Sequence, residues 1–66
     1  MKYFRTLREN KNLTQCELAQ KLGVGQNTVS NWENGIAKPD IETVVALSKI
    51  FETSIENVAK CFVRGA

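Results

Sequence analysis

The sequence has no histidine, only two cysteines, a single proline and no long apolar run. A zinc site needs about four thiolate or imidazole ligands, which Cys16 and Cys61 cannot supply by themselves. The chain also lacks a nucleophile–base pair in sequence context, a carboxylate constellation and a glycine-rich loop for phosphate. We therefore expect no metal, no cofactor and no enzymatic activity.

The absence of long apolar stretches argues against two further classes of protein. No segment approaches the roughly 20 apolar residues of a membrane span. The start of the chain lacks the apolar core of a signal peptide. These features predict a cytoplasmic protein that has no membrane partner.

The chain has 66 residues, which we interpret as a single domain over residues 1–66. A domain of this size buries only about 60% of the surface that its unfolded chain exposes, so its core is thin. Dimerisation therefore stays open as a further source of stability for this domain. A disulfide between Cys16 and Cys61 is also open, although small disulfide scaffolds usually carry more bridges.

Charge is distributed unevenly along the chain. Residues 1–38 hold six basic and three acidic side chains, whereas residues 39–66 hold three basic and four acidic ones. A polyanion would be expected to dock on the basic first half. Ordinary surface charge explains the same numbers equally well, so charge alone does not decide between the two interpretations.

What the sequence does contain is apolar residues at helical spacing, and no segment shows a sustained period of two. Local signals mark the helix ends. Thr14 and Glu17 form a capping box, Gly23 occupies a left-handed C-terminal position, and Gly35 follows the third helix. Pro39 fits the N-cap or first position of the fourth helix. We predict a compact all-α fold of five short helices, over residues 2–10, 15–22, 26–34, 40–51 and from 55 onward.

The apolar positions also predict which faces of these helices are buried. The first three helices contribute a set of seven residues: Phe4, Leu7, Leu18, Ala19, Leu22, Val29 and Trp32. The fourth helix contributes a stripe of six: Ile41, Val44, Val45, Leu47, Ser48 and Phe51. The last helix contributes Val58, Ala59 and Phe62.

The third predicted helix, Gln26–Asn34, has an unusual outward face. With Val29 and Trp32 directed inward, a spacing of 100° per residue directs amide and hydroxyl side chains outward. Asparagine is a poor helix former, so helix stability does not explain this choice. Amides pair with adenine edges, and hydroxyls pair with either partner, in the DNA major groove. We interpret the face as a base-reading surface; the alternative is an αα-hairpin with a plain polar face. The candidate base-reading residues are Gln26, Asn27, Ser30 and Asn31.

Two further features concern charge near this helix. Glu33 lies beside its buried face and Arg8 is the natural counter-ion, so we expect a buried structural ion pair rather than an exposed glutamate. The N-terminus of the second helix offers unpaired N–H groups to phosphate, and Thr14 and Gln15 stand there. The candidate backbone-contacting residues are Thr14, Gln15, Thr28, Asn34 and Lys38.

Two motifs in this region resemble the helix-turn-helix of the Cro and phage-repressor (XRE) family. They read Leu13-Thr14-Gln15-x-Glu17-Leu18-Ala19-x-Lys21-Leu22-Gly23-Val24 and Gln26-x-Thr28-Val29-Ser30-x-Trp32-Glu33-Asn34-Gly35. The similarity continues through Lys38-Pro39-Asp40 and Ser54-Ile55 and covers about residues 3–60. The resemblance implies a five-helix, lambda-repressor-like fold and a DNA-binding transcriptional regulator, usually a repressor that binds as a dimer.

The resemblance also implies roles for particular residues. Gln15 matches a position that contacts the DNA backbone and braces base-reading side chains, and Arg8 and Glu33 match the family's ion pair between helices one and three. Positions that read bases in the family are matched by Gln26, Asn27 and Asn31. Positions that contact the backbone are matched by Thr14, Asn34 and Lys38.

The sequence departs from the family pattern in three places. Gly25 replaces the usual serine or threonine before the third helix, which removes a side-chain contact to phosphate. Glu52 stands where glycine commonly closes the fourth helix, so the geometry of that turn stays open. Cys16 and Cys61 do not belong to the pattern. Cys16 neighbours the DNA-facing helix end, but a free cysteine is more often inert than regulatory.

We expect a homodimer on a double-stranded DNA operator, with each recognition helix in a major groove and half-sites about 10 bp apart or a multiple of that. The last helix would supply the dimer contact through the exposed members of one set: Ile55, Val58, Cys61 and Phe62. Alternatively, all four only cover the core. A different partner protein, as for an antitoxin or an adaptor, is also open.

Overall fold

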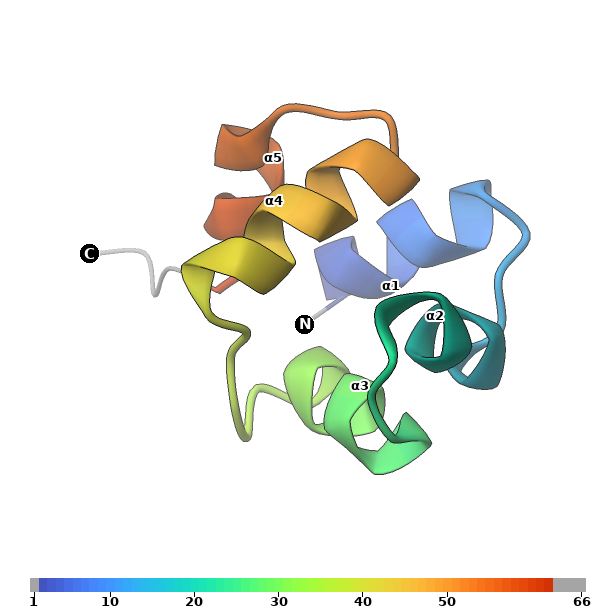
Figure 1. Ribbon diagram of the computed structural model, residues 1–66. Coiled ribbons are helices and arrows are strands. Elements are labelled where there is room, and N and C mark those ends of the chain that lie inside the picture. Colours follow the sequence, from blue (N-terminus) through green and yellow to red (C-terminus); the bar gives the residue numbers. More distant parts are fainter. Residues whose placement is uncertain (1, 63–66) are drawn as a thin grey trace.

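The computed structural model describes residues 2–62, which form five helices and no strand. The helices are α1 (Lys2–Asn10), α2 (Gln15–Leu22), α3 (Gln26–Glu33), α4 (Ile41–Ile50) and α5 (Ile55–Lys60). α2 packs against α3, α4 packs against α5, and α1 lies between these two pairs (Figure 1). The predicted all-α fold is confirmed. α3 ends one residue earlier than expected, and α4 is one residue shorter at each end.

The ends of α2 form as the sequence predicts. The Thr14 hydroxyl accepts the N–H of Glu17 at 3.0 Å, and the Glu17 carboxylate accepts the N–H of Thr14 at 2.9 Å. The helix ends at Gly23, whose φ of 72° is left-handed and therefore favours glycine. Both signals are local in the chain, and both are confirmed.

Acidic residues flank both ends of α4, one as the N-cap and one directly after the C-cap. Asp40 is the N-cap, and its carboxylate accepts the N–H of Thr43 at 2.9 Å, so Pro39 precedes the helix rather than entering it. The residue after the C-cap, Glu52, has a φ of 54° and accepts a hydrogen bond from the Lys11 ammonium at 2.7 Å. The turn that glycine commonly closes in related sequences is here closed by a left-handed glutamate, held by an ion pair to the α1–α2 turn.

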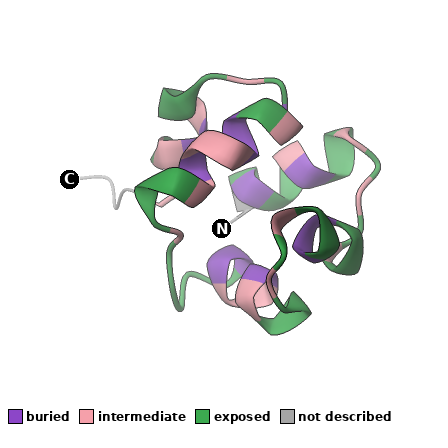
Figure 2. Ribbon diagram, viewed as in Figure 1, coloured by how far each residue is buried: buried purple, intermediate pink, exposed green. Residues whose placement is uncertain are grey.

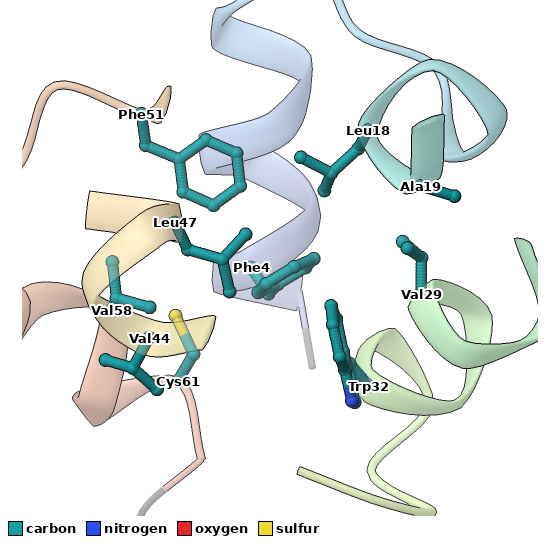
Figure 3. Packing of buried hydrophobic residues seen from close by; sticks show 10 residues of the cluster. All are labelled: Phe4, Leu18, Ala19, Val29, Trp32, Val44, Leu47, Phe51, Val58 and Cys61. Atoms are coloured by element: carbon teal, nitrogen blue, oxygen red, sulfur yellow. The ribbon is translucent and has the colours of Figure 1, made fainter. Parts of the chain in front are cut away.

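Phe4 of α1 lies at the centre of the core. Its ring lies edge-on to Trp32 at 6.2 Å and to Phe51 at 5.5 Å, and tilted against Phe62 at 5.5 Å, measured between centroids. Figure 3 shows Phe4 between the side chains of α2 and α3 on one side and those of α4 and α5 on the other. Such aromatic pairs stabilise a core beyond the area they bury, so Phe4 joins the two helix pairs.

One prediction about burial needs correction, and one set of candidates is narrowed. Ile41, the first residue of α4, is 69% exposed, whereas Val44 and Leu47 in the following turns are buried. Among the four candidate dimer residues, Val58 and Cys61 are buried in the core, Ile55 is exposed and Phe62 is half-buried. Figure 2 shows that α4 carries buried and exposed stretches along the same helix.

The cysteines do not form the disulfide that the sequence left open. Both thiols are free, with Cys16 exposed on α2 and Cys61 buried beyond α5. Burial raises the pKa of the Cys61 thiol, and its sulfur lies 3.6 Å from the carbonyl oxygen of Asn57. Cys61 is therefore a small core residue that stays protonated at neutral pH.

Candidate nucleic-acid interface

α2 and α3 are joined by a short turn that sets their relative orientation. Gly23 turns the chain in the left-handed region, and the N–H of Val24 returns to the carbonyl of Ala19 at 3.0 Å. Gly25 then starts α3 as an extended N-cap. Leu18 and Val29 are both fully buried in the shared core. The unit is a helix–turn–helix whose second helix is fixed by its inner face.

A buried ion pair anchors α3 from behind. The Arg8 Nε donates to Glu33 Oε2 at 2.6 Å and its Nη2 donates to Oε1 at 3.3 Å, and both residues are only 7% exposed. A further guanidinium nitrogen of Arg8 donates to the carbonyl of Leu13 at 2.6 Å. The structure thus brings Arg8 and Glu33 together and ties both to the chain just before α2. A buried pair with good geometry and further hydrogen bonds offsets the cost of its desolvation.

Gln15 belongs to the same network, which sequence reasoning missed. Its side-chain N–H group donates to Glu33 Oε1 at 3.2 Å, across 18 residues of chain. The start of α2 is therefore bonded directly to the end of α3. No periodicity or local motif signals a hydrogen bond over this separation.

The outer face of α3 is polar, and part of it is unused by the fold. Gln26 and Asn27 are exposed, and Asn31 is half-buried. Within residues 2–62 the carboxamides of these three residues have no hydrogen-bond partner. The amide of Asn34 instead donates to the hydroxyl of half-buried Ser30 at 3.3 Å. Three amide groups at the surface are thus available to a ligand.

The interface is nearly neutral. The only charged side chain in α3 is Glu33, which Arg8 neutralises. Residues 14–35 contain one lysine, the exposed Lys21 in the last turn of α2, and two glutamates. Lys38, also exposed, lies in the loop that follows α3. Positive charge therefore flanks α3 instead of lying on it.

The candidate backbone-contacting residues lie around this helix. Thr14 is exposed at the N-terminus of α2, where its hydroxyl serves the capping box, and Gln15 is half-buried beside it. Thr28 is half-buried on α3, whereas Asn34 is exposed at its C-cap. The first turn of α2 carries N–H groups and the positive end of the helix dipole, which together attract anions.

Gly25 leaves open space at the start of α3. It makes no side-chain cap, and a Cβ added there would meet no atom within 4 Å. The missing hydroxyl removes one donor from the interface and exposes the backbone at the point where α3 begins.

This geometry defines a helix-turn-helix domain, and comparison with known proteins agrees. A helix-turn-helix family (HTH_3) matches residues 4–58, and the chain belongs to this family. The resemblance to the XRE family seen in the sequence is thereby confirmed.

Three relatives illustrate the range of the family. The HTH-type transcriptional activator BcrR of Enterococcus faecalis is 40% identical over 52 residues, which are 79% of this chain and 26% of that protein. The cryptic phage CTXphi transcriptional repressor RstR of Vibrio cholerae is 41% identical over 51 residues, 77% of this chain and 46% of the repressor. The uncharacterized HTH-type transcriptional regulator MJ0272 of Methanocaldococcus jannaschii is 38% identical over 58 residues, 88% of this chain and 83% of that protein.

The chain spans less than half the length of the first two relatives and most of the third. No solved structure shows a significant match to it. None of the helices between residues 2 and 62 has the length and apolar character that crossing a membrane requires.

Proposed function

We propose that this chain binds double-stranded DNA in a sequence-specific manner and regulates transcription, with α3 in the major groove. The observation that carries the proposal is the outer face of α3, where Gln26 and Asn27 are exposed and their carboxamides are not used by the fold. An α-helix fits the major groove of B-DNA, and amides both donate to and accept from base edges there. The family of the chain supports the same function.

Contacts to the DNA backbone would come from residues that flank α3. One N–H of the Gln15 amide is bonded to Glu33, and its second N–H is available to a phosphate oxygen. Thr14 would contact the DNA backbone at the N-terminus of α2. Lys38, in the loop after α3, would supply a positive charge at the other flank of that helix. Thr28 and Asn34 complete the set of proposed backbone contacts. These contacts position the helix but carry no sequence information.

We further propose a homodimer on the operator, with half-sites about 10 bp apart or a multiple of that. Because Val58 and Cys61 are buried, the contact is assigned to Ile55 and Phe62. Phe62 lines a groove with Ile41, which is 69% exposed and extends the apolar surface. Analytical ultracentrifugation with and without operator DNA tests this part. A strict monomer in both conditions, at high concentration, would contradict it.

A repressor is the favoured regulatory role. Occupying an operator blocks access by other proteins and needs no surface beyond the one that binds DNA. RstR, a relative at 41% identity, is named a transcriptional repressor. BcrR is named an activator, so whether the chain lowers or raises expression must be measured in cells. A promoter carrying the operator should lose expression when the chain is produced, and a gain in expression would reverse the assignment.

DNA binding itself is tested by fluorescence anisotropy on the full chain. Duplexes that the chain retains from fragmented genomic DNA are compared with shuffled duplexes of the same composition. We expect at least tenfold tighter binding to the retained duplexes. We also expect the double variant Gln26→Ala/Asn27→Ala to lose this preference, while Glu56→Ala on α5 keeps it. Equal affinity for retained and shuffled duplexes would exclude a sequence-specific regulator.

A further inference from the structure

We infer that the positions read by α3 are adenines in A·T base pairs, and that guanine is absent from them. This inference rests on the proposed placement of α3 in the major groove and specifies its substrate. It follows from which hydrogen-bonding groups the outer face of α3 presents and which of those groups the fold already uses.

The first step is chemical. In the major groove guanine presents two acceptors, N7 and O6, and is best bound by the charged fork of arginine or by lysine. Adenine presents one acceptor, N7, and one donor, the N6 amino group. A carboxamide carries one donor group and one acceptor, which match adenine in a bidentate pair. α3 contains no lysine or arginine, so its complement is adenine.

The second step separates available groups from occupied ones. Ser30 and Asn34 are bonded to each other at 3.3 Å, and Gln15 is bonded to Glu33 at 3.2 Å. The carboxamides of Gln26, Asn27 and Asn31 have no partner within the part of the chain that is described. Three of the four candidate readers are therefore amides, and the positions they read are the ones assigned to adenine. The fourth, Ser30, accepts from Asn34 and keeps its O–H as a single donor.

The third step is spacing. Asn27 and Asn31 are four residues apart and share one face of α3, which separates them by about 6 Å along the helix axis. Side chains three to four residues apart on one face of a helix in the major groove contact neighbouring bases, so Asn27 and Asn31 would read adjacent positions. Gln26 precedes Asn27 and extends the reach at the N-terminus of the helix. Each half-site should thus hold two or three adenines within about four base pairs.

The fourth step concerns the exposed lysines that flank α3 in the sequence. Lys21 lies on α2 and Lys38 lies in the loop after α3, so neither belongs to α3 itself. Lysine acts as a point charge toward phosphate oxygens, which surround the groove on both sides. To recognise guanine at the positions read by α3, one of these lysines would have to contact a base instead of a phosphate.

Selection from a random duplex pool by the full chain tests the inference. We expect a motif whose half-sites contain two or three adenines, on either strand, within about four base pairs. Half-sites with invariant guanine at these positions would overturn the inference while leaving the proposed function intact. A pool without any enriched motif would overturn the proposed function, and the inference with it.

Atom-level substitution in the selected duplex gives a second test. Replacing a contacted adenine by 7-deazaadenine removes the N7 acceptor but keeps the base pair. Loss of one bidentate contact should weaken binding by about five- to 150-fold. 7-Deazaguanine placed at any guanine of the same duplex should change affinity less than about twofold, because no guanine is read. The reverse pattern, with loss confined to 7-deazaguanine, would overturn the inference.

A change of specificity provides the matched protein variant. Asn27 is exposed, so Asn27→Arg should fold normally. We expect it to replace adenine by guanine at one position of the selected half-site and to leave the other positions unchanged. Glu56→Ala, at an exposed position on α5, serves as the control and should select the original motif. An unchanged motif for Asn27→Arg would place Asn27 outside the base contacts and contradict the inference at that residue.

Discussion

The two helices of the helix-turn-helix begin in different ways. α2 starts with a complete capping box, in which Thr14 and Glu17 satisfy each other's backbone N–H groups. α3 starts at Gly25, which has no side chain to cap it. α2 also contains alanine, two leucines and a lysine, which are good helix formers, whereas α3 contains two asparagines, a threonine and a serine. The local sequence stabilises α2 well and α3 poorly.

α3 is instead held by contacts that are distant in the chain. Val29 and Trp32 bury its inner face, and Glu33 joins it to Arg8 and Gln15. Because these contacts hold the helix from behind, its outer face can carry residues that add nothing to stability. The comparison teaches that α2 is built for folding and α3 for presenting side chains. This difference can be tested by substitutions on the buried side of α3 and at the starts of both helices.

The largest effect is expected from Glu33→Ala, which leaves Arg8 buried without its partner. Removing one member of a buried pair costs about 3–5 kcal/mol, a large part of the stability of a domain this small. We expect most of the helical signal to be lost, as measured by circular dichroism and urea unfolding. The double variant Arg8→Met/Glu33→Leu removes both charges and should recover the fold. A loss below about 1 kcal/mol for Glu33→Ala would mean that the pair behaves like an exposed one.

A smaller effect is expected at the start of α2. Thr14→Ala removes the hydroxyl that accepts the Glu17 N–H, and loss of such a cap costs about 1 kcal/mol. Thr14→Ser keeps the hydroxyl and is the matched control. Urea unfolding of the two variants should separate them by most of that amount. If the two variants were equally stable, the capping box would contribute nothing, and α2 would depend on its packing as α3 does.

The features of α2 could be predicted from sequence, because caps and turns depend on residues three or four apart. Thr14, Glu17 and Gly23 gave both ends of the helix, and the spacing of apolar positions gave the five helices. The neutral outer face of α3 was also predictable, since the spacing of Val29 and Trp32 fixes which residues point outward. The structure leaves Gln26 and Asn27 exposed there.

What could not be predicted depends on neighbours distant in the chain. Ile41 fits the apolar stripe of α4 by spacing, but it is the first residue of the helix and is exposed. Spacing placed Val58 on the buried face of the last helix, as found, but it did not include Cys61, which is also buried. The Gln15–Glu33 hydrogen bond and the Lys11–Glu52 ion pair both join turns that periodicity does not relate, and both were missed.

The two helix starts should also differ in their response to acid. Hydrogen bonds from Thr14, from its backbone N–H and then its side chain, lower the pKa of Glu17 below its ordinary value of 4.5. Because the folded pKa is the lower one, this stabilisation is present above pH 4.5 and is lost as the pH falls through the folded pKa. The start of α3 has no carboxylate and contributes no such dependence.

Urea unfolding at a series of pH values measures this difference. We expect the free energy of unfolding to fall between about pH 5 and pH 3, and Glu17→Gln to remove part of that fall. Asp40 and Glu52, whose pKa values are also lowered, by Thr43 and Lys11 respectively, contribute to the same fall. Glu56→Gln, which removes an exposed carboxylate on α5, is the control for the change of net charge. An identical profile for Glu17→Gln and the parent chain would contradict the role of the capping box.

The smallest effect is expected from repairing the start of α3. Gly25→Ser supplies a hydroxyl that can accept the N–H of Thr28, and serine exceeds glycine as an N-cap by only a few tenths of a kcal/mol. The φ of −79° suits serine, and no atom lies within 4 Å of the added Cβ, so we expect a small gain in stability. Thermal unfolding should show it as a slightly raised midpoint.

Gly23→Ser is the matched contrast within the same turn. Its surroundings are equally open, but its φ of 72° is left-handed, a region that costs an ordinary residue about 1–2 kcal/mol. The two variants add the same side chain to equally empty space, so their difference isolates the backbone conformation. Opposite signs are expected. If both substitutions destabilised the domain, α3 would need glycine at its start for a reason other than capping, and the comparison of the two helix starts would fail at that point.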